Sequence, residues 1–258
     1  MNLIEILPGI EIADLALFLK KENILVIGDV HLGYEAAVIK QGIFIPRFQF
    51  KDTMARLEKI FVVLHQLQER GSSSGNNERI ASKKLEAVVI NGDLKHDFGA
   101  ISDQEWRDIL KLLDFLLQNA GQVIIIRGNH DIKLAPIARK RGIAVVENVA
   151  INGKFICHGH EVPGSAEFEK SEMVIVGNEH PAVSLREGAR SELYKCFLVG
   201  KWGKKKMVVM PSFNQITIGT DILKEIFISP FMQQDLRGFD VFAIGDKAYY
   251  LGKVKDIS

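Results

Sequence analysis

Cysteine is scarce in this sequence, since only Cys157 and Cys196 occur among 258 residues. This scarcity excludes a disulfide framework and a metal site built from several thiolates. No apolar run reaches the length of about 18 residues that marks a transmembrane helix. The first residues also lack the basic and then apolar pattern of a signal peptide. We therefore expect a cytoplasmic protein with no membrane attachment.

A strong charge of either sign is also missing. The 33 Lys and Arg residues nearly balance the 32 Asp and Glu residues, and the formal net charge is +1. The overall charge therefore gives no argument for a polyanionic partner. The phosphate-binding patterns G-x-G-x-x-G and G-x-x-x-x-G-K-[ST] do not occur, which sets aside a nucleotide-binding α/β module.

What the chain does contain is a recurring pattern of apolar segments that run directly into polar loops. The loops are Gly28-Asp29-Val30-His31, Asn91-Gly92-Asp93, Gly128-Asn129-His130-Asp131, His158-Gly159-His160 and Gly177-Asn178-Glu179-His180. Six of the seven histidines lie in these loops or close behind them. In an extended chain, residues i and i+2 point to the same side, so Asp29 and His31 can reach one ion.

The spacing of apolar residues predicts α/β architecture. Helices are expected from Phe50 to Arg70, from Ser102 onward behind a capping box, and over residues 133–141. Short strands are expected near residues 195–200, 206–210, 215–219, 240–245 and 247–252. Residues 71–84 have almost nothing to bury and predict an exposed loop of the kind that is often disordered. We expect residues 1–258 to form one domain of two packed sheets with helices outside.

Asp, Asn and His together form a hard-to-borderline set of ligands without thiolate. Such a set suits Mn²⁺, Fe, Zn²⁺, Co²⁺ or Ni²⁺. A carboxylate in the middle loop can bridge two ions, which would bind a phosphate between them and lower the pKa of a bound water. The pattern therefore points to phosphoryl chemistry. Any one of these loops alone is more often an ordinary turn after a strand.

The loop order resembles that of the calcineurin-like metallophosphoesterase superfamily, whose pattern is D-x-H, G-D, G-N-H-D/E, H and G-H-x-H. The resemblance covers residues 28–180. Within the superfamily, the segments around Ile45-Pro46-Arg47 and Met210-Pro211-Ser212-Phe213 resemble archaeal phosphoesterases related to SbcD-type repair nucleases. The resemblance implies a four-layer αββα sandwich of two mixed sheets flanked by helices.

By position, the resemblance implies a role for each loop residue. Asp29, His31 and His180 would bind the first metal ion, Asp93 would bridge, and Asn129 and His158 would bind the second. His130 would act on the leaving group as a catalytic residue, oriented by Asp131. His96, His160 and Arg47 are expected to contact the substrate, although His96 is equally well explained as a residue that fixes its own loop.

One position departs from the superfamily pattern, because Asn178 replaces the first His of G-H-x-H. An amide oxygen can bind a hard ion but binds Zn²⁺ or Ni²⁺ more weakly than imidazole does. We therefore expect either a weakened second site, with Asn178 as a poor ligand, or a water in its place.

The sequence thus predicts a phosphoesterase with two divalent transition-metal ions, Mn²⁺ being the first choice, that hydrolyses phosphodiester bonds by a metal-activated hydroxide. The expected substrates are nucleic acids or nucleotides. Small or single-stranded substrates are favoured, because the sandwich leaves no residues for a separate DNA-binding domain. The alternative is a metal-binding scaffold of low activity that partners a DNA-repair enzyme. The sequence leaves open whether the protein is a monomer or a homodimer.

Overall fold

A computed structural model describes residues 2–71, 84–97, 103–131, 133–188 and 190–257. Most of the loop predicted over residues 71–84, and Ser102 of the predicted capping box, lie outside the described residues.

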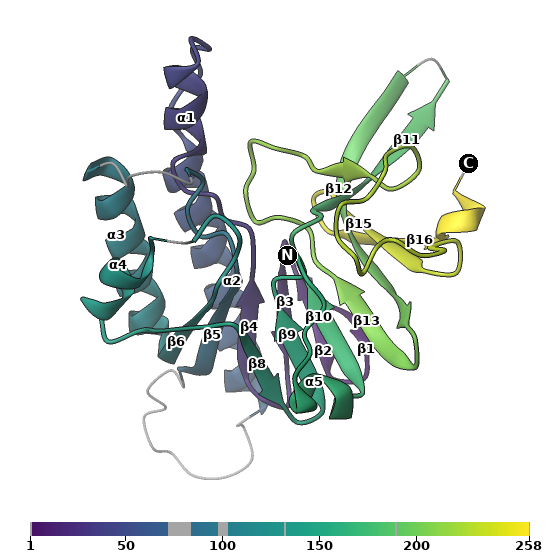
Figure 1. Cartoon of the computed structure of the whole chain (residues 1–258), viewed down its shortest axis with the longest axis horizontal. Coiled ribbons are helices and arrows are strands. Elements are labelled where there is room, and N and C mark those ends of the chain that lie inside the picture. The colour runs from purple at the N-terminus through teal and green to yellow at the C-terminus, as the bar shows by residue number, and fades with distance from the viewer. Residues whose placement is uncertain (1, 72–83, 98–102, 132, 189, 258) are drawn as a thin grey trace.

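The first sheet has seven strands in the order β1-β2-β3-β4-β5-β6-β7 (Figure 1). They are β1 (Ile4–Leu7), β2 (Ile10–Ala13), β3 (Ala16–Leu19), β4 (Ile24–Ile27), β5 (Leu85–Asn91), β6 (Ala120–Ile126) and β7 (Ala144–Val146). The strands β1 to β4 are antiparallel to their neighbours, and β4 to β7 run parallel. The carboxyl ends of β4, β5 and β6 therefore lie at one edge.

The second sheet has nine strands, with β14-β11-β12-β13-β10-β9-β8 as its main order and β15 and β16 added beside β12. They are β8 (Asn148–Ile151), β9 (Lys154–Cys157), β10 (Met173–Val176), β11 (Pro181–Glu187), β12 (Arg190–Trp202), β13 (Lys205–Val209), β14 (Thr220–Asp221), β15 (Asp240–Ile244) and β16 (Ala248–Lys253). The strands β9, β10 and β13 are mutually parallel, so their carboxyl ends also meet at one edge.

The two sheets pack face to face because the inward-facing residues of their strands are apolar. Ile156, Ile175 and Val208 belong to the core shared with the first sheet, whereas their neighbours Phe155 and Val174 face the opposite side and pack in a second core. Successive residues of a strand point to opposite faces, and here both faces are buried. The inward faces form the inner layers of a sandwich.

Helices cover the outer face of the first sheet. They are α2 (Gln49–Gly71), α3 (Asp103–Asn119) and α4 (Ala135–Arg139), whereas α1 (Tyr34–Lys40) stands at the top of the view in Figure 1. The outer face of the second sheet is covered by α5 (Ala166–Lys170), by the irregular segment 222–239 and by η1 (Val254–Asp256). The predicted α/β class with two mixed sheets and helices is confirmed, and the fourth layer consists largely of irregular chain.

One predicted strand is wrong. Residues 215–219 form no strand, although Ile216 and Ile218 alternate with polar residues. The neighbouring strand β14 is limited to Thr220–Asp221, which pairs with β11. The main chain just before them follows the first sheet instead, since the N–H of Phe213 donates to Gly28 O (2.8 Å) and that of Asn214 to Asp29 O (3.1 Å). No helix among the described residues is long and apolar enough to cross a membrane.

Candidate metal centre

The predicted loops converge where the carboxyl ends of the two sheets meet. Asp29 follows β4, Asp93 follows β5 and Asn129 follows β6, all in the first sheet. His158 follows β9 and Asn178 follows β10 in the second sheet. Residues far apart in sequence thereby come within a few ångströms of one another.

Five of the predicted site residues have a left-handed backbone. The φ angles are 55° at Asp29, 48° at His31, 46° at Asp93, 62° at Asn178 and 49° at His180. Such angles are uncommon for residues other than glycine and cost about 1–3 kcal/mol each unless the surroundings impose them. Here the main chains support one another, since the Asp29 N–H donates to Gly92 O (3.0 Å) and the His31 N–H to Asp93 O (2.8 Å).

Asp29, His31 and His180 form one group of candidate ligands, with one atom from each lying within 4.8 Å of the others. The Asp29 Oδ1 and His180 Nε2 atoms are 3.1 Å apart, yet neither has a hydrogen-bond partner among the described residues. Burial lowers the pKa of His31 to about 3, so its imidazole is neutral and has a free lone pair.

Asp29, Asp93 and His158 form a second group of candidate ligands, again with one atom from each lying within 4.8 Å of the others. The Nδ1–H of His158 donates to Asn91 O (3.3 Å), which leaves Nε2 facing Asn129 Oδ1 at 2.9 Å and Asp93 Oδ2 at 3.4 Å. A ligating histidine commonly donates its other ring N–H to a carbonyl in this way. Asp29 belongs to both groups.

The charges of this second group are strongly coupled. Burial alone would raise the pKa of Asp93, but its hydrogen bond to His158 and the charge of His158 bring the pKa below the usual range. Burial opposes the charged form of His158, but the contacts with Asp93 and Asp29 raise its pKa to about 9. Two buried carboxylates therefore call for a compensating cation.

His130 faces the same carboxylate from the third loop. Its Nε2 lies 3.8 Å from Asp93 Oδ2, and its Nδ1–H donates to the main-chain carbonyl of His96. Its main-chain N–H donates to Asp93 Oδ1 at 2.9 Å. Nε2 is therefore the ring nitrogen of His130 that lies on the side of Asp93.

The contacts of the Asp131 carboxylate run to main-chain N–H groups. It accepts from Leu94 (3.1 Å), Lys95 (3.4 Å) and Gly128 (3.1 Å). We expected Asp131 to orient the His130 ring, but these contacts show that it joins the second loop to the third. Burial and then the charge of Asp93 raise the pKa of Asp131 to about 6.

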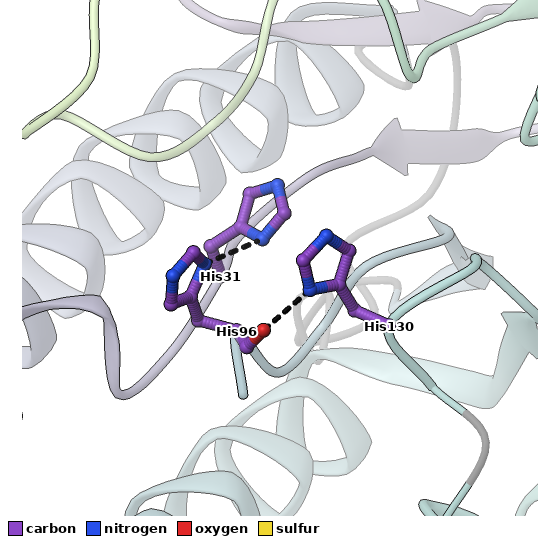
Figure 2. A group of neighbouring side chains, drawn as sticks. All are labelled: His31, His96 and His130. Carbon is purple, nitrogen blue, oxygen red and sulfur yellow. Dashed lines mark hydrogen bonds between the residues drawn. The ribbon is translucent and has the colours of Figure 1, made fainter. Parts of the chain in front are cut away.

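His96 forms a triangle with His31 and His130, whose ring centroids lie 5.0 to 5.4 Å apart (Figure 2). Its Nδ1 is 3.5 Å from His31 Nδ1, and its ring stacks on that of His130 with centroids 5.4 Å apart. His96 therefore contacts one candidate ligand through its ring and holds His130 through its carbonyl. The three histidines also form a third group of closely spaced ligand atoms.

The remaining predicted residues differ in their placement. Asn178 reaches the site through its main chain, whose N–H donates to Asp29 Oδ2 (3.3 Å). His160 is exposed, with its ring 5.3 Å from that of His158, and can meet a substrate. Arg47 donates to Gln104 at 2.7 Å, so its described contact is with α3 rather than with the histidines.

Several supporting residues have no signal in the sequence. The Gln49 side chain is buried and donates to Val30 O (3.1 Å) and His31 O (2.7 Å), which fixes the strained turn. Asn91 orients His158 through its carbonyl. The segment containing Phe213 was singled out by resemblance, and it does lie against Gly28 and Asp29.

The residues present fit divalent metal ions. Among the residues that the structure describes, carboxylate, amide and imidazole atoms converge without thiolate, and the buried Asp29 Oδ1 and His180 Nε2 have no hydrogen-bond partner there. Such orphaned atoms are expected where a ligand or ion belongs. The donor set matches the preference of Mn²⁺, Fe²⁺ and related ions.

Comparison with known proteins identifies the same part of the chain. Residues 22–212 match the family described as Calcineurin-like phosphoesterase. No match was found among curated protein sequences. Among solved structures, the nuclease MPE of Pseudomonas putida superposes with a TM-score of 0.65 at 19% identity, over 97% of this chain and 99% of that one. Vacuolar Protein Sorting 29 of Cryptosporidium parvum matches at a TM-score of 0.37 and 16% identity, over 89% and 97% of the two chains.

The nuclease shares the fold at this level of identity, and the second likeness is too weak to carry an argument. The family match spans most of the chain and includes all five loops of the candidate site. The chain belongs to the calcineurin-like phosphoesterase family and is a metal-dependent phosphoesterase.

Proposed function

We propose that this protein is a binuclear phosphodiesterase that acts on nucleic acids or nucleotides, with Mn²⁺ as the preferred ion. The observation that carries the proposal is the pair of ligand groups that share Asp29. One group adds His31 and His180, and the other adds Asp93 and His158. Two adjoining groups suit two ions better than one.

In this proposal Asp29, His31 and His180 would hold the first ion, and Asn129 and His158 would hold the second. Asp93 would bridge, because its Oδ2 lies 3.8 Å from His31 Nε2 and 3.4 Å from His158 Nε2. Asn178 is at best a weak ligand of the second ion, because an amide oxygen replaces imidazole. When bound, divalent ions lower the pKa of a bound water and stabilise charge on the phosphoryl oxygens.

The chain's own residues supply the proton transfer. The Nδ1–H of His130 donates to the His96 carbonyl, so Nε2 is the ring nitrogen that we propose acts on the substrate. That nitrogen faces Asp93 at the centre of the site. In the protonated form of His130 it can donate to the oxygen that leaves phosphorus. Asp131 positions His130 indirectly, by holding its loop against Leu94 and Lys95.

Two likenesses support a phosphodiester substrate. The structural neighbour from Pseudomonas putida is a nuclease, and the motifs resemble the SbcD-related branch of phosphoesterases. The exposed His160 beside His158 provides a place where a bound phosphodiester can be contacted. We propose single-stranded or small phosphodiesters as the natural substrates.

The test is hydrolysis of bis(p-nitrophenyl) phosphate by protein that has been stripped with a chelator. We expect turnover only after Mn²⁺ is restored, and a large loss in His130→Ala. If the folded protein shows no turnover with Mn²⁺, Ni²⁺ or Co²⁺, the proposed phosphodiesterase activity is wrong, and the result favours a metal-binding scaffold. If turnover is found, the same protein is assayed on single-stranded and double-stranded oligonucleotides.

A further inference from the structure

Glu179 stands between Asn178 and His180 in the loop after β10, and the proposed proton transfer gives it no part. The residue is only 5% exposed. Its Oε2 atom accepts hydrogen bonds from the main-chain N–H groups of Ile228 (2.9 Å) and Ser229 (2.7 Å). A buried carboxylate is costly unless such donors compensate it. The carboxylate thus ties this ligand loop to a segment 49 and 50 residues further along the chain.

Ser229 makes a second tie, to the other ligand loop of the second sheet. The serine is fully buried, and its Oγ–H donates to the main-chain carbonyl of Gly159 at 2.7 Å. Gly159 directly follows His158, the proposed ligand of the second ion. The two loops also meet directly, since the Gly177 N–H donates to His158 O (2.9 Å). Ser229 therefore connects the loop of His158 with the loop of His180.

The segment around Ser229 is anchored by apolar packing on one side only. Phe231 and Met232 are fully buried in the outer core of the second sheet, and the Met232 N–H donates to Ser229 O (2.9 Å). On the other side, the Ile228 side chain is 83% exposed. The main chain at Ile228 is therefore held by Glu179 and not by burial of its own side chain.

The loop that carries Glu179 needs such support because its main chain is strained. The φ angles are 62° at Asn178 and 49° at His180, on either side of Glu179. Left-handed residues other than glycine persist only where the surroundings impose that conformation. The two hydrogen bonds to the Glu179 carboxylate fix the turn between them.

We propose that Glu179 and Ser229 are positioning residues, which hold His180 and His158 where they bind the two metal ions. These roles rest on the proposed binuclear centre. Glu179 acts on the loop that carries a ligand of the first ion, and Ser229 acts on the loop that carries a ligand of the second. Residues that orient metal ligands from behind raise metal affinity, because the ligands are already in place when the ion binds.

The test is titration of metal-free protein with Co²⁺, followed by the visible absorption of the bound ion. We expect Ser229→Ala to weaken the binding of one of the two ions by about tenfold. Glu179→Ala should weaken binding by about 10-fold to 100-fold. Glu179→Gln should recover most of that loss, because its amide oxygen can still accept both main-chain N–H groups.

Ser171→Ala is the matched control. The Ser171 Oγ–H also donates to a main-chain carbonyl, that of Phe168, at 2.7 Å, and Ser171 is buried. Ser171 precedes β10, however, and lies at the end of that strand away from the ligand loop. Its replacement should lower the midpoint of urea denaturation without changing the affinity for Co²⁺. Circular dichroism shows whether each variant is folded.

The outcomes separate these roles from the proposed function. Wild-type protein that binds fewer than two Co²⁺ ions per chain would overturn the binuclear centre and the positioning roles with it. If wild-type protein binds two ions, unchanged affinities in folded Ser229→Ala or Glu179→Ala would overturn the role of that residue alone. An equal loss of affinity in Ser171→Ala would overturn both roles, because general destabilisation would then explain the effect. If Glu179→Ala does not fold, Ser229→Ala decides the question.

Discussion

The Asp131 carboxylate accepts a hydrogen bond from the main-chain N–H of Leu94, 3.1 Å away. This bond joins the loop that carries Asp93 to the loop that carries Asn129 and His130. Asp131 is almost fully buried and also accepts from Gly128. Asp131 therefore holds the loop that carries Asp93 against the loop that carries Asn129 and His130.

Replacing Asp131 by Asn should weaken this connection. The amide offers only one acceptor oxygen and places an NH₂ group against main-chain donors. We expect a loss of about 2 kcal/mol in the free energy of unfolding, as for hydrogen bonds to charged groups. The kcat of the folded fraction should also fall. Urea denaturation and steady-state assays measure the two effects, and an unchanged stability would refute the connecting role.

His130→Ala should separate catalysis from metal binding. Because His130 is proposed to act on the leaving group, kcat should fall by about 100-fold to 10,000-fold. The amount of bound Mn²⁺, measured by plasma mass spectrometry, should stay the same. His65→Gln on α2 is the control and should leave kcat unchanged. Loss of metal in His130→Ala would instead make His130 a ligand.

Gly128→Ala tests the close packing around Asp93. A Cβ at Gly128 would lie 2.1 Å from Asp93 Oδ1 and 2.3 Å from its main-chain nitrogen, so Asp93 must move. We expect reduced metal content and little activity. At Gly164 a Cβ meets no atom within 4 Å, so Gly164→Ala is the matched control. Normal metal binding by Gly128→Ala would contradict the proposed bridging position of Asp93.

Asn178→His should strengthen metal binding, since imidazole replaces an amide oxygen. After dialysis against a weak chelator, the variant should retain more Mn²⁺ per chain than wild-type protein does. Equal retention of two ions by both proteins would show that Asn178 does not limit the second site.

The ion pair between Glu22 and Lys154 should make stability depend on acidity. The Lys154 Nζ and Glu22 Oε1 atoms are 2.8 Å apart, and the pair links the two sheets. The Glu22 side chain is 2% exposed and that of Lys154 is 14% exposed. Burial would raise the pKa of Glu22, but the hydrogen bonds from Lys154 and Asn152 lower it overall. The stabilisation is therefore present above the ordinary Glu pKa and is lost as the pH falls through the lowered value.

Glu22→Gln should accordingly lose about 2 kcal/mol at neutral pH. The difference from wild-type protein should shrink in acid, as Glu22 of the wild-type protein becomes protonated. Thermal melting between neutral pH and pH values below the ordinary Glu pKa measures this. A difference that is constant across the range would mean that the charge of Glu22 contributes nothing.

The sequence by itself determined where the polar loops of the candidate metal centre lie. Each strand before a polar loop is a local apolar run. Asp29 and His31 do fall in one ligand group, as expected, but their backbone is left-handed rather than extended. The sandwich of two sheets was expected from the resemblance of the loop motifs to the calcineurin-like superfamily. Local pattern was enough to place the loops because strand formation and burial depend on neighbouring residues.

Only the tertiary structure decided how the loops contact one another. Asp131 lies beside His130 in sequence, yet its partners are Leu94 and Lys95, about 36 positions away. Residues 215–219 alternate like a strand but gain no neighbouring strand, because the preceding chain bonds to Gly28 and Asp29. Such contacts depend on which distant segments the fold brings together, and no local pattern encodes that.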